Sequence, residues 1–190
     1  RTEHPLSQGI KEKVALFCNV AKSAVIECRD VPSIYEVPLR MQEEGLDEIV
    51  LSKMGLENVQ PANLTQWTGF LTKLQTATEI VRIGLVGKYV ELPDAYKSII
   101  ESLIHASAYN ERKLKLELIQ SEKLTAENVT KTLSGLDGIL IAPGFGDRGI
   151  EGKFIACQYA RENNIPTLGI CLGMQCMVID IARNMLGYAD

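Results

Sequence analysis

The chain has 190 residues, a formal net charge of −4 at pH 7 and a hydrophobic content of 46%. This length is sufficient for one ordinary domain or for two small pieces. The mildly acidic charge offers no basic surface for nucleic acid, and no apolar run is long enough to cross a membrane. We find no signal peptide, low-complexity tract or internal repeat, so we expect a globular protein with no nucleic-acid or membrane partner.

The cysteine content is an odd number and lacks the spacing of a zinc site. It favours a reduced, cytoplasmic protein with one reactive thiol and four thiols that pack in a core. The five cysteines are Cys18, Cys28, Cys157, Cys171 and Cys176.

The first 75 residues predict short, mixed elements. The polar stretch 1–13 predicts a loop, and the continuous apolar run 14–20 is suited to a buried strand. Residues 25–28 predict another short strand. Asp30 or Ser33 should cap a helix that Pro38 breaks or restarts and that ends near residue 45.

Two further helices are expected before the pattern changes. One covers 46–56, and a clearer one covers 63–75. The second has apolar residues at helical spacing that should face a core, and its tryptophan is expected to pack there. These residues are Trp67, Phe70, Leu71 and Leu74. Residues 76–79 predict a linker.

From residue 80 onward strands alternate with helices. Strands are expected over 80–87, over 113–120 as an exposed edge, over 138–142, and just before Cys171. The helices are predicted from Pro93 at the first helical position, after Thr125 as cap to about 133, over 150–163 and over 174–186. This order predicts an α/β fold with a parallel sheet covered on both faces. The chemistry of such sheets lies at the carboxyl ends of the strands, where 87–89, the glycine-rich loop 143–149 and Cys171 should converge.

The stretch 166–175 places Gly-x-Cys-x-Gly between a strand and a helix, as in a nucleophile elbow. Gly169 and Gly173 allow close backbone approach around a sharp, strained turn. The thiol of Cys171 would project over a helix N-terminus, which favours thiolate over thiol. The N–H of Leu172 would point toward an oxyanion formed on a substrate carbonyl.

Gly-Ile-Cys-Leu-Gly-Met-Gln resembles the nucleophile segment of class I, triad-type glutamine amidotransferases. Its sequence is most similar to that segment in CTP synthases. Five further segments resemble that family in the same order, namely ALFCNV, SIYEVP, ANLTQW, GKYVELPDAYKSI and GFGDRGIEGK. The resemblance implies the N-terminal half of a flavodoxin-like amidotransferase domain over 80–190. It also implies the C-terminal part of a P-loop-type α/β synthetase (amidoligase) domain over 1–75, with 76–79 as the linker.

The resemblance implies a ligase of pyrimidine nucleotide biosynthesis. In that family ammonia released from glutamine passes through the protein interior and aminates UTP, which ATP has activated, to give CTP. ATP with Mg²⁺ and the allosteric activator GTP would be the cofactors, with metal ligands outside this chain. The implied partners are UTP, ATP, glutamine, GTP and further copies of the chain in a homotetramer.

The resemblance also assigns roles to residues in the amidotransferase half. Cys171 matches the nucleophile that forms a glutamyl thioester. The glutamine-binding and oxyanion positions correspond to Gly144, Phe145, Leu172, Gly173, Met174 and Gln175. The family often has glycine where this chain has Pro143. Positions linked to GTP activation correspond to Lys97, Arg148, Gly149 and Glu151, with solvated surface charges as the alternative for Lys97 and Arg148.

In the first 75 residues, Lys13 matches a position that contacts UTP or the feedback inhibitor CTP. Spacing alone would make Lys13 a surface lysine. The stretch bordering the ATP adenine corresponds to Arg29, Asp30 and Val31. Arg1 could contact a nucleotide phosphate.

A thiol nucleophile needs a base and an orienting carboxylate. The only histidines are His4, in the polar leader, and His105, expected on a helix surface. The family's His-x-Glu pair would follow Asp190, and its phosphate loop would precede Arg1. We therefore expect these 190 residues alone to catalyse neither half-reaction, and to be poorly soluble because half a sheet leaves an open edge.

Three alternatives remain open from the sequence. The chain could belong to another class I amidotransferase, such as a GMP or anthranilate synthase subunit. It could be a non-catalytic interaction or regulatory fragment that assembles with full-length chains. It could also be a cysteine hydrolase of the related flavodoxin-like type.

Overall fold

The computed structural model describes residues 1–56, 59–92 and 94–188. Backbone contacts divide the chain into two compact units, Arg1–Thr72 and Lys73–Asp190. The predicted helix start at Pro93 lies outside the described residues. Among the described helices, none combines the length and the apolar character needed to cross a membrane.

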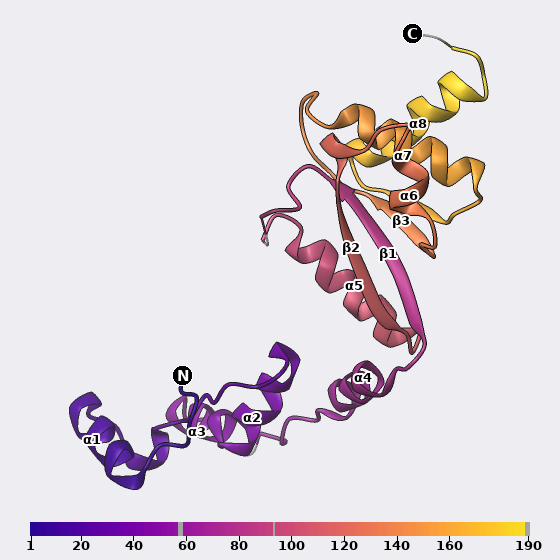
Figure 1. The fold of residues 1–190 in the computed structure, drawn as a ribbon. Helices are drawn as coiled ribbons and strands as arrows, with labels where there is room; N and C mark the ends of the chain where they lie inside the picture. The colour runs from indigo at the N-terminus through magenta and orange to yellow at the C-terminus, as the bar shows by residue number, and fades with distance from the viewer. Residues whose placement is uncertain (57–58, 93, 189–190) are drawn as a thin grey trace. The chain divides into compact units, whose positions relative to one another are not determined.

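The first unit is built from short helices, drawn in indigo and purple in Figure 1. They are α1 (Gln8–Cys18), α2 (Val37–Glu43), α3 (Leu46–Lys53) and the first part of α4 (Thr65–Thr76), with 3₁₀ turns at Lys22–Ala24 and Ile34–Glu36. The helices predicted over 46–56 and 63–75 are thus confirmed. Ser33 caps the turn before α2 by accepting a hydrogen bond from the Tyr35 N–H, and Pro38 lies in the first turn of α2.

The predicted strand over 14–20 is wrong, because residues 14–18 form the second half of α1. Ser7 caps the helix by accepting from the Ile10 N–H, and Asn19 ends it in the left-handed conformation with φ 52°. An apolar run of this length is compatible with either element, and the flanking caps decide for helix. Phe17 is 78% exposed and Cys18 is exposed, so Cys18 is not a core thiol.

The predicted strand over 25–28 is also wrong. Thr2 and Arg29 form an isolated parallel bridge, in which the Thr2 N–H donates to the Cys28 carbonyl over 3.1 Å. Arg1 Nε lies 2.6 Å from Asp30 Oδ1 beside this bridge. The first residues are therefore fixed against 28–30, and the polar leader is a loop only as far as α1.

Aromatic side chains hold α4 to the segment before α2. The Trp67 Nε1–H donates to the Tyr35 carbonyl over 2.8 Å, and the Phe70 ring meets the Tyr35 ring edge-on with centroids 5.2 Å apart. Leu71 is only 4% exposed. The predicted packing role of the tryptophan is confirmed.

The second unit contains a four-stranded parallel sheet in the order β2-β1-β3-β4. Its strands are β1 (Ile80–Gly87), β2 (Lys113–Gln120), β3 (Gly138–Ile141) and β4 (Thr167–Gly169). The pairing of Gly87 with Gln120 and of Ile141 with Gly169 brings all four carboxyl ends to one edge. The predicted α/β fold, the parallel sheet and the exposed position of 113–120 at its edge are confirmed.

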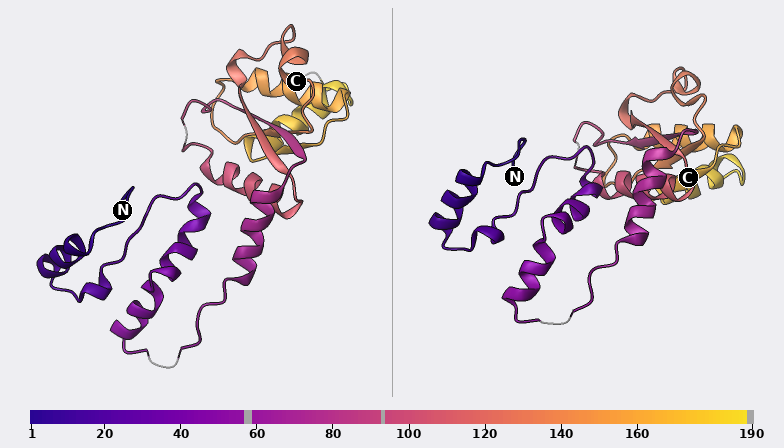
Figure 2. Two further views of the ribbon diagram at one scale, coloured as in Figure 1. Left: turned by 60° about the horizontal axis from the view of Figure 1, so that its bottom comes forward. Right: turned by 90° about the horizontal axis from the view of Figure 1, so that it is seen from below.

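Helices cover both faces of this sheet (Figures 1 and 2). α5 (Lys97–Tyr109) packs on the face that carries Leu85 and Leu140. The opposite face carries Val86 and Ile141 and is covered by α6 (Val129–Leu133), α7 (Ile150–Glu162) and α8 (Leu172–Asn184). Leu85 and Val86 face opposite cores because successive strand residues alternate between faces.

The helix that Thr125 was expected to cap is instead capped three residues later. The Thr125 N–H donates to Asn128 Oδ1, and the Asn128 N–H donates to the Thr125 carbonyl, so these residues close a turn. Asn128 is the N-cap of the five-residue α6. Local side-chain to backbone hydrogen bonds compete with helix formation at such positions.

Candidate active site

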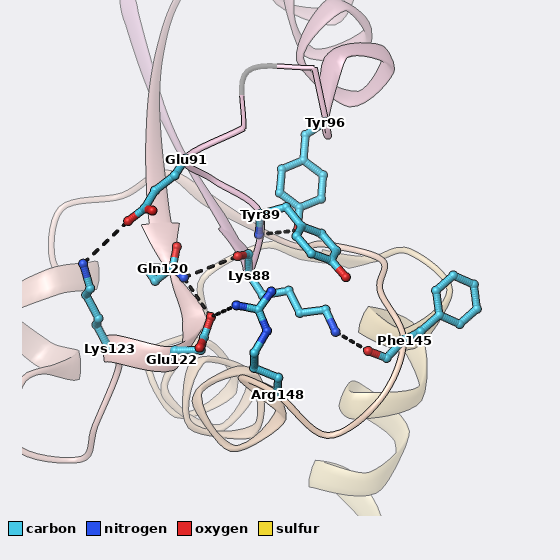
Figure 3. A network of polar contacts seen from close by, with 9 residues as sticks. All are labelled: Lys88, Tyr89, Glu91, Tyr96, Gln120, Glu122, Lys123, Phe145 and Arg148. Carbon is cyan, nitrogen blue, oxygen red and sulfur yellow. Dashed lines mark hydrogen bonds and ion pairs between the residues drawn. The ribbon is translucent and has the colours of Figure 1, made fainter.

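Three segments that follow strands meet at the carboxyl edge of the sheet. Lys88, directly after β1, donates a hydrogen bond through Nζ to the carbonyl of Phe145 in the loop after β3 (Figure 3). A Cβ atom placed on Gly144 would lie 3.7 Å from Cδ2 of Leu172, which follows the cysteine after β4. The convergence expected from the sequence is confirmed.

Cys171 is the turning point between β4 and α8. Its backbone has φ 52° and ψ −112°, and it is the N-cap of α8. A positive φ is rare for a residue with a side chain and stores strain of about 1–3 kcal/mol. The side chain is exposed. The structure therefore shows the sharp, strained turn with an accessible thiol that the sequence predicts.

The two flanking glycines leave no room for a side chain. A Cβ atom on Gly169 would lie 2.5 Å from the Met174 nitrogen, and one on Gly173 would lie 2.0 Å from the Ile141 carbonyl oxygen. Both distances are far below van der Waals contact. These positions allow α8 to begin directly against the ends of β3 and β4.

The first turn of α8 starts at Leu172, two residues earlier than predicted. The Gly173 N–H already donates to the Ile170 carbonyl, and the Gln175 N–H donates to the Cys171 carbonyl. N–H groups at the first positions of a helix have no intrahelical acceptor. Leu172, immediately after the thiol, is the first residue of α8, so its N–H is one of these groups. Met174 is half exposed beside it.

The loop after β3 is held from below by a lysine that the sequence analysis missed. Lys153 on α7 is 1% exposed, and its Nζ donates to the Ala142 carbonyl over 2.7 Å. The buried stripe of α7 otherwise consists of small residues, including Gly152, Ala156 and Ala160. The sequence signal that could have identified Lys153 is its position among the small apolar residues on the buried side of this helix.

A polar network joins the same loop to the end of β2 (Figure 3). Arg148 Nη1 lies 2.9 Å from Glu122 Oε1, and Gln120 Nε2 donates to that oxygen over 2.8 Å and to the Lys88 carbonyl over 3.3 Å. The Arg148 guanidinium and the Lys88 ammonium lie 5.4 and 5.2 Å from the centroid of the Tyr89 ring. Two cations therefore share one aromatic ring above the carboxyl edge.

The other loop residues singled out by the sequence lie near this network or along α5. Gly149 has φ 74° and is the N-cap of α7, and Glu151 is exposed in the first turn of that helix. Lys97 begins α5, and its Nζ lies 2.6 Å from Glu101 Oε1. Hydrogen bonding to Glu101 raises the pKa of Lys97.

The nucleotide-related positions belong to the first unit. Lys13 is exposed on α1. Arg29 takes part in the bridge with Thr2, and Asp30 is paired with Arg1, whose hydrogen bond lowers the pKa of the Asp30 carboxyl. Val31 is half buried beside them.

The two histidines lie in different units of the chain. His4 belongs to the first unit, and His105 lies eight residues into α5, which returns toward the amino ends of the strands. Its predicted exposure on that helix is confirmed. Within residues 1–56, 59–92 and 94–188, no cluster of three or more His, Cys, Asp or Glu residues could hold a metal ion.

The remaining thiols of the second unit are buried and differ sharply from Cys171. Burial raises the pKa of Cys157 to about 12 and is also the main cause of the raised pKa of Cys176. A thiol that stays protonated is a poor nucleophile. Cys171 is thus the accessible thiol at the carboxyl edge, and the prediction that Cys157 and Cys176 pack in a core is confirmed.

Comparison with known families matches both parts of the chain. Residues 91–187 match the family of class-I glutamine amidotransferases, and residues 1–56 match the CTP synthase N-terminus. The first match covers half of the chain. The chain belongs to the class-I glutamine amidotransferase family.

Individual relatives that match the whole chain are CTP synthases. The chain is 60% identical over all 190 residues to the CTP synthase of Bacteroides fragilis, and it is also 60% identical to that of Porphyromonas gingivalis. It spans only 36% and 35% of the lengths of these two proteins. A solved structure of the Trypanosoma brucei CTPS glutaminase domain with bound acivicin superposes with a TM-score of 0.54 and 42% identity. That match covers 58% of this chain and 43% of the trypanosomal chain.

Proposed function

We propose that these residues form part of a CTP synthase and carry the cysteine of its glutaminase site. The observation that carries the proposal is the strained, exposed Cys171 at the N-terminus of α8, beside the loop after β3. The match of residues 1–56 to the CTP synthase N-terminus favours this type over other class-I amidotransferases. The whole-chain identity to CTP synthases supports the same assignment.

The proposed reaction begins with attack of the Cys171 sulfur on the side-chain amide carbon of glutamine. A C–S bond forms, and the carbonyl π electrons move onto oxygen as an oxyanion. When that oxyanion collapses, the C–N bond breaks and the nitrogen leaves as ammonia after gaining a proton. Water then hydrolyses the glutamyl thioester and regenerates the thiol.

The chain offers backbone donors for the oxyanion. We assign this role to the N–H of Leu172 at the start of α8 and to N–H groups of the loop at Gly144 and Phe145. Gly173 and Gln175 fix the first turn of α8 through their own hydrogen bonds. Met174, half exposed, and Gln175 would line the bound glutamine.

We assign the base and the orienting carboxylate to other residues of the complete protein, because His105 lies on α5, which returns toward the amino ends of the strands. The ligands of Mg²⁺ are likewise assigned to other residues of the complete protein, because the described residues contain no cluster of three or more His, Cys, Asp or Glu side chains that could hold a metal ion.

The use of ammonia to aminate ATP-activated UTP is proposed for the complete protein. Within it we assign Lys13 to UTP or CTP, and Arg29, Asp30 and Val31 to the border of the ATP adenine. GTP activation is assigned to Lys97, Arg148, Gly149 and Glu151. The exposure of Lys13, Lys97 and Glu151 is compatible with these roles. A homotetrameric, cytoplasmic protein completes the proposal, and five free thiols suit a reducing compartment.

Replacement of Cys171 by serine in the complete protein tests the proposal. C171S should lose glutamine-dependent CTP formation, because the hydroxyl is far less nucleophilic than the thiol, and it should keep ammonia-dependent CTP formation. Cys18→Ser, at an exposed cysteine in the first unit, is the matched control and should keep both activities. Full glutamine-dependent activity in C171S would refute the nucleophile. Absence of glutamine hydrolysis in the complete parent protein would favour the non-catalytic alternative.

A further inference from the structure

Two buried lysines grip the loop after β3 from different elements. Lys153, on α7, is 1% exposed and donates through Nζ to the Ala142 carbonyl over 2.7 Å and to the Pro143 carbonyl over 3.5 Å. Lys88, after β1, is 6% exposed and donates to the Phe145 carbonyl (Figure 3). Three of the four carbonyls from 142 to 145 thus meet an ammonium group.

These contacts set the direction of the loop's N–H groups. In a trans peptide the carbonyl oxygen of one residue and the N–H of the next point in opposite directions. An ammonium on the Pro143 oxygen therefore turns the Gly144 N–H away from Lys153. The Lys88 contact with the Phe145 oxygen does the same for the Gly146 N–H. Pro143 has no N–H, so this orientation is imposed on the following residues alone.

Gly144 is enclosed by both lysines and by the elbow. A Cβ atom on Gly144 would lie 3.4 Å from Lys88 Cε, 3.6 Å from Lys153 Nζ and 3.7 Å from Leu172 Cδ2. The lysines therefore position a loop residue that lies directly beside the start of α8. Leu172, whose N–H is the other proposed oxyanion donor, is the contact from that side.

The charge of Lys153 is difficult to explain by packing alone. Burying an ammonium is unfavourable unless it is hydrogen-bonded, and its neighbours on α7 are small apolar residues. Burial is the main cause that lowers the pKa of Lys153, and the nearby Lys88 ammonium lowers it further, whereas the thiols of Cys176, Cys157 and Cys171 act in the opposite direction. A leucine or methionine would fill the same space without this penalty.

We propose that Lys153, together with Lys88, is a positioning residue of the glutaminase site. The two ammonium groups hold 142–146 in the conformation whose N–H groups face the oxyanion formed at the glutamine carbonyl. The proposal rests on the proposed function, because it assigns how that site stabilises its oxyanion. Neither lysine touches the substrate, and both act through the loop backbone.

The test compares Lys153→Met with Lys131→Met in the complete protein. Methionine keeps the length of the side chain but removes the charge and the donors, and Lys131 is an exposed lysine on α6. In K153M we expect kcat for glutamine hydrolysis to fall about 10- to 100-fold, less than or near the loss of one oxyanion donor. KM for glutamine and ammonia-dependent CTP formation should stay within about twofold, and K131M should match the parent protein.

Alkylation of Cys171 by iodoacetamide distinguishes an effect on the oxyanion loop from an effect on the reactivity of the thiol. This reaction displaces iodide from a saturated carbon and forms no oxyanion, so its rate should be unchanged in K153M. A kcat within twofold of the parent would overturn the proposal, and so would equal losses in kcat and in alkylation rate. If K153M does not fold, Lys88→Met takes its place with the same expected split and the same contradicting results. A parent protein without glutaminase activity would instead refute the proposed function.

Discussion

The position of a Cβ atom on Gly173 lies 2.0 Å from the carbonyl oxygen of Ile141. The first turn of α8 is therefore pressed onto the end of β3, with backbone against backbone. This contact fixes where the elbow cysteine emerges, since Gly173 follows Cys171 by two residues. Neither partner can move aside as a flexible side chain would.

Gly173→Ala should consequently destabilise the protein and reduce glutamine hydrolysis. Overpacking of this kind costs about 1–3 kcal/mol or more, and relief of the clash would shift the Leu172 N–H and the thiol. Thermal unfolding and kcat for glutamine hydrolysis measure both effects. Gly69→Ala is the control, because Gly69 is an exposed position of α4 where a Cβ meets no atom within 4 Å, and alanine is favoured over glycine in a helix by up to about 1 kcal/mol. An unchanged melting temperature in G173A would contradict the packing described here.

A buried ion pair joins α7 to α8 and predicts a second effect on stability. Asp180 is 3% exposed. Its carboxylate accepts hydrogen bonds from Arg161 Nε over 2.8 Å and from Asn184 Nδ2 over 2.7 Å. Asp180→Ala should lower the free energy of unfolding by about 2–3 kcal/mol, somewhat less than for a fully buried pair, because Arg161 keeps some contact with water.

The same arginine supplies the control for that measurement. Glu162 lies 3.9 Å from Arg161 Nη2 with an exposed carboxylate, so Glu162→Ala should change the free energy of unfolding by about 0.5 kcal/mol or less. Urea denaturation of both variants gives the comparison. Equal effects of the two substitutions would show that burial of Asp180 does not strengthen its contribution.

The buried thiol of Cys157 predicts a loss of stability at alkaline pH. Its pKa is raised from 9.0 to about 12 by burial, so between these values the unfolded chain has lost a proton that the native state retains. The stability it contributes is complete below about pH 9 and declines by about 1.4 kcal/mol per pH unit as the pH rises toward 12.

Cys157→Ala should remove this slope. We expect the free energy of unfolding of the parent to fall more steeply than that of C157A between pH 9 and 10.5, in urea titrations at fixed ionic strength. Tyr96, whose pKa is also raised by burial, is present in both proteins and cancels in the difference. Parallel slopes above pH 9 would rule out Cys157 as the cause.

The elements of the second unit were predictable because their signals are strong and local. The strands 80–87 and 138–142 are apolar runs followed by glycine or proline, and buried parallel strands have that composition. The elbow was predictable from two glycines around a cysteine, because only glycine permits the contacts at Gly169 and Gly173.

The errors occurred where the deciding interactions are not periodic. The apolar run 14–20 is compatible with a strand or with a helix, and the caps Ser7 and Asn19 determine that a helix forms. The start of α6 depends on hydrogen bonds between Thr125 and Asn128. Lys153 was missed because its importance lies in carbonyls that are distant in sequence from its own turn of α7.

Labelling of the complete protein with a glutamine-analogue electrophile tests whether Cys171 is the glutaminase nucleophile. We predict one covalent adduct, found by mass spectrometry on the peptide that contains Cys171, with loss of glutamine hydrolysis in proportion to labelling. Added glutamine should slow the labelling, because both compounds compete for the same site. Labelling of a different cysteine, or labelling of Cys171 that glutamine does not slow, would contradict the assignment.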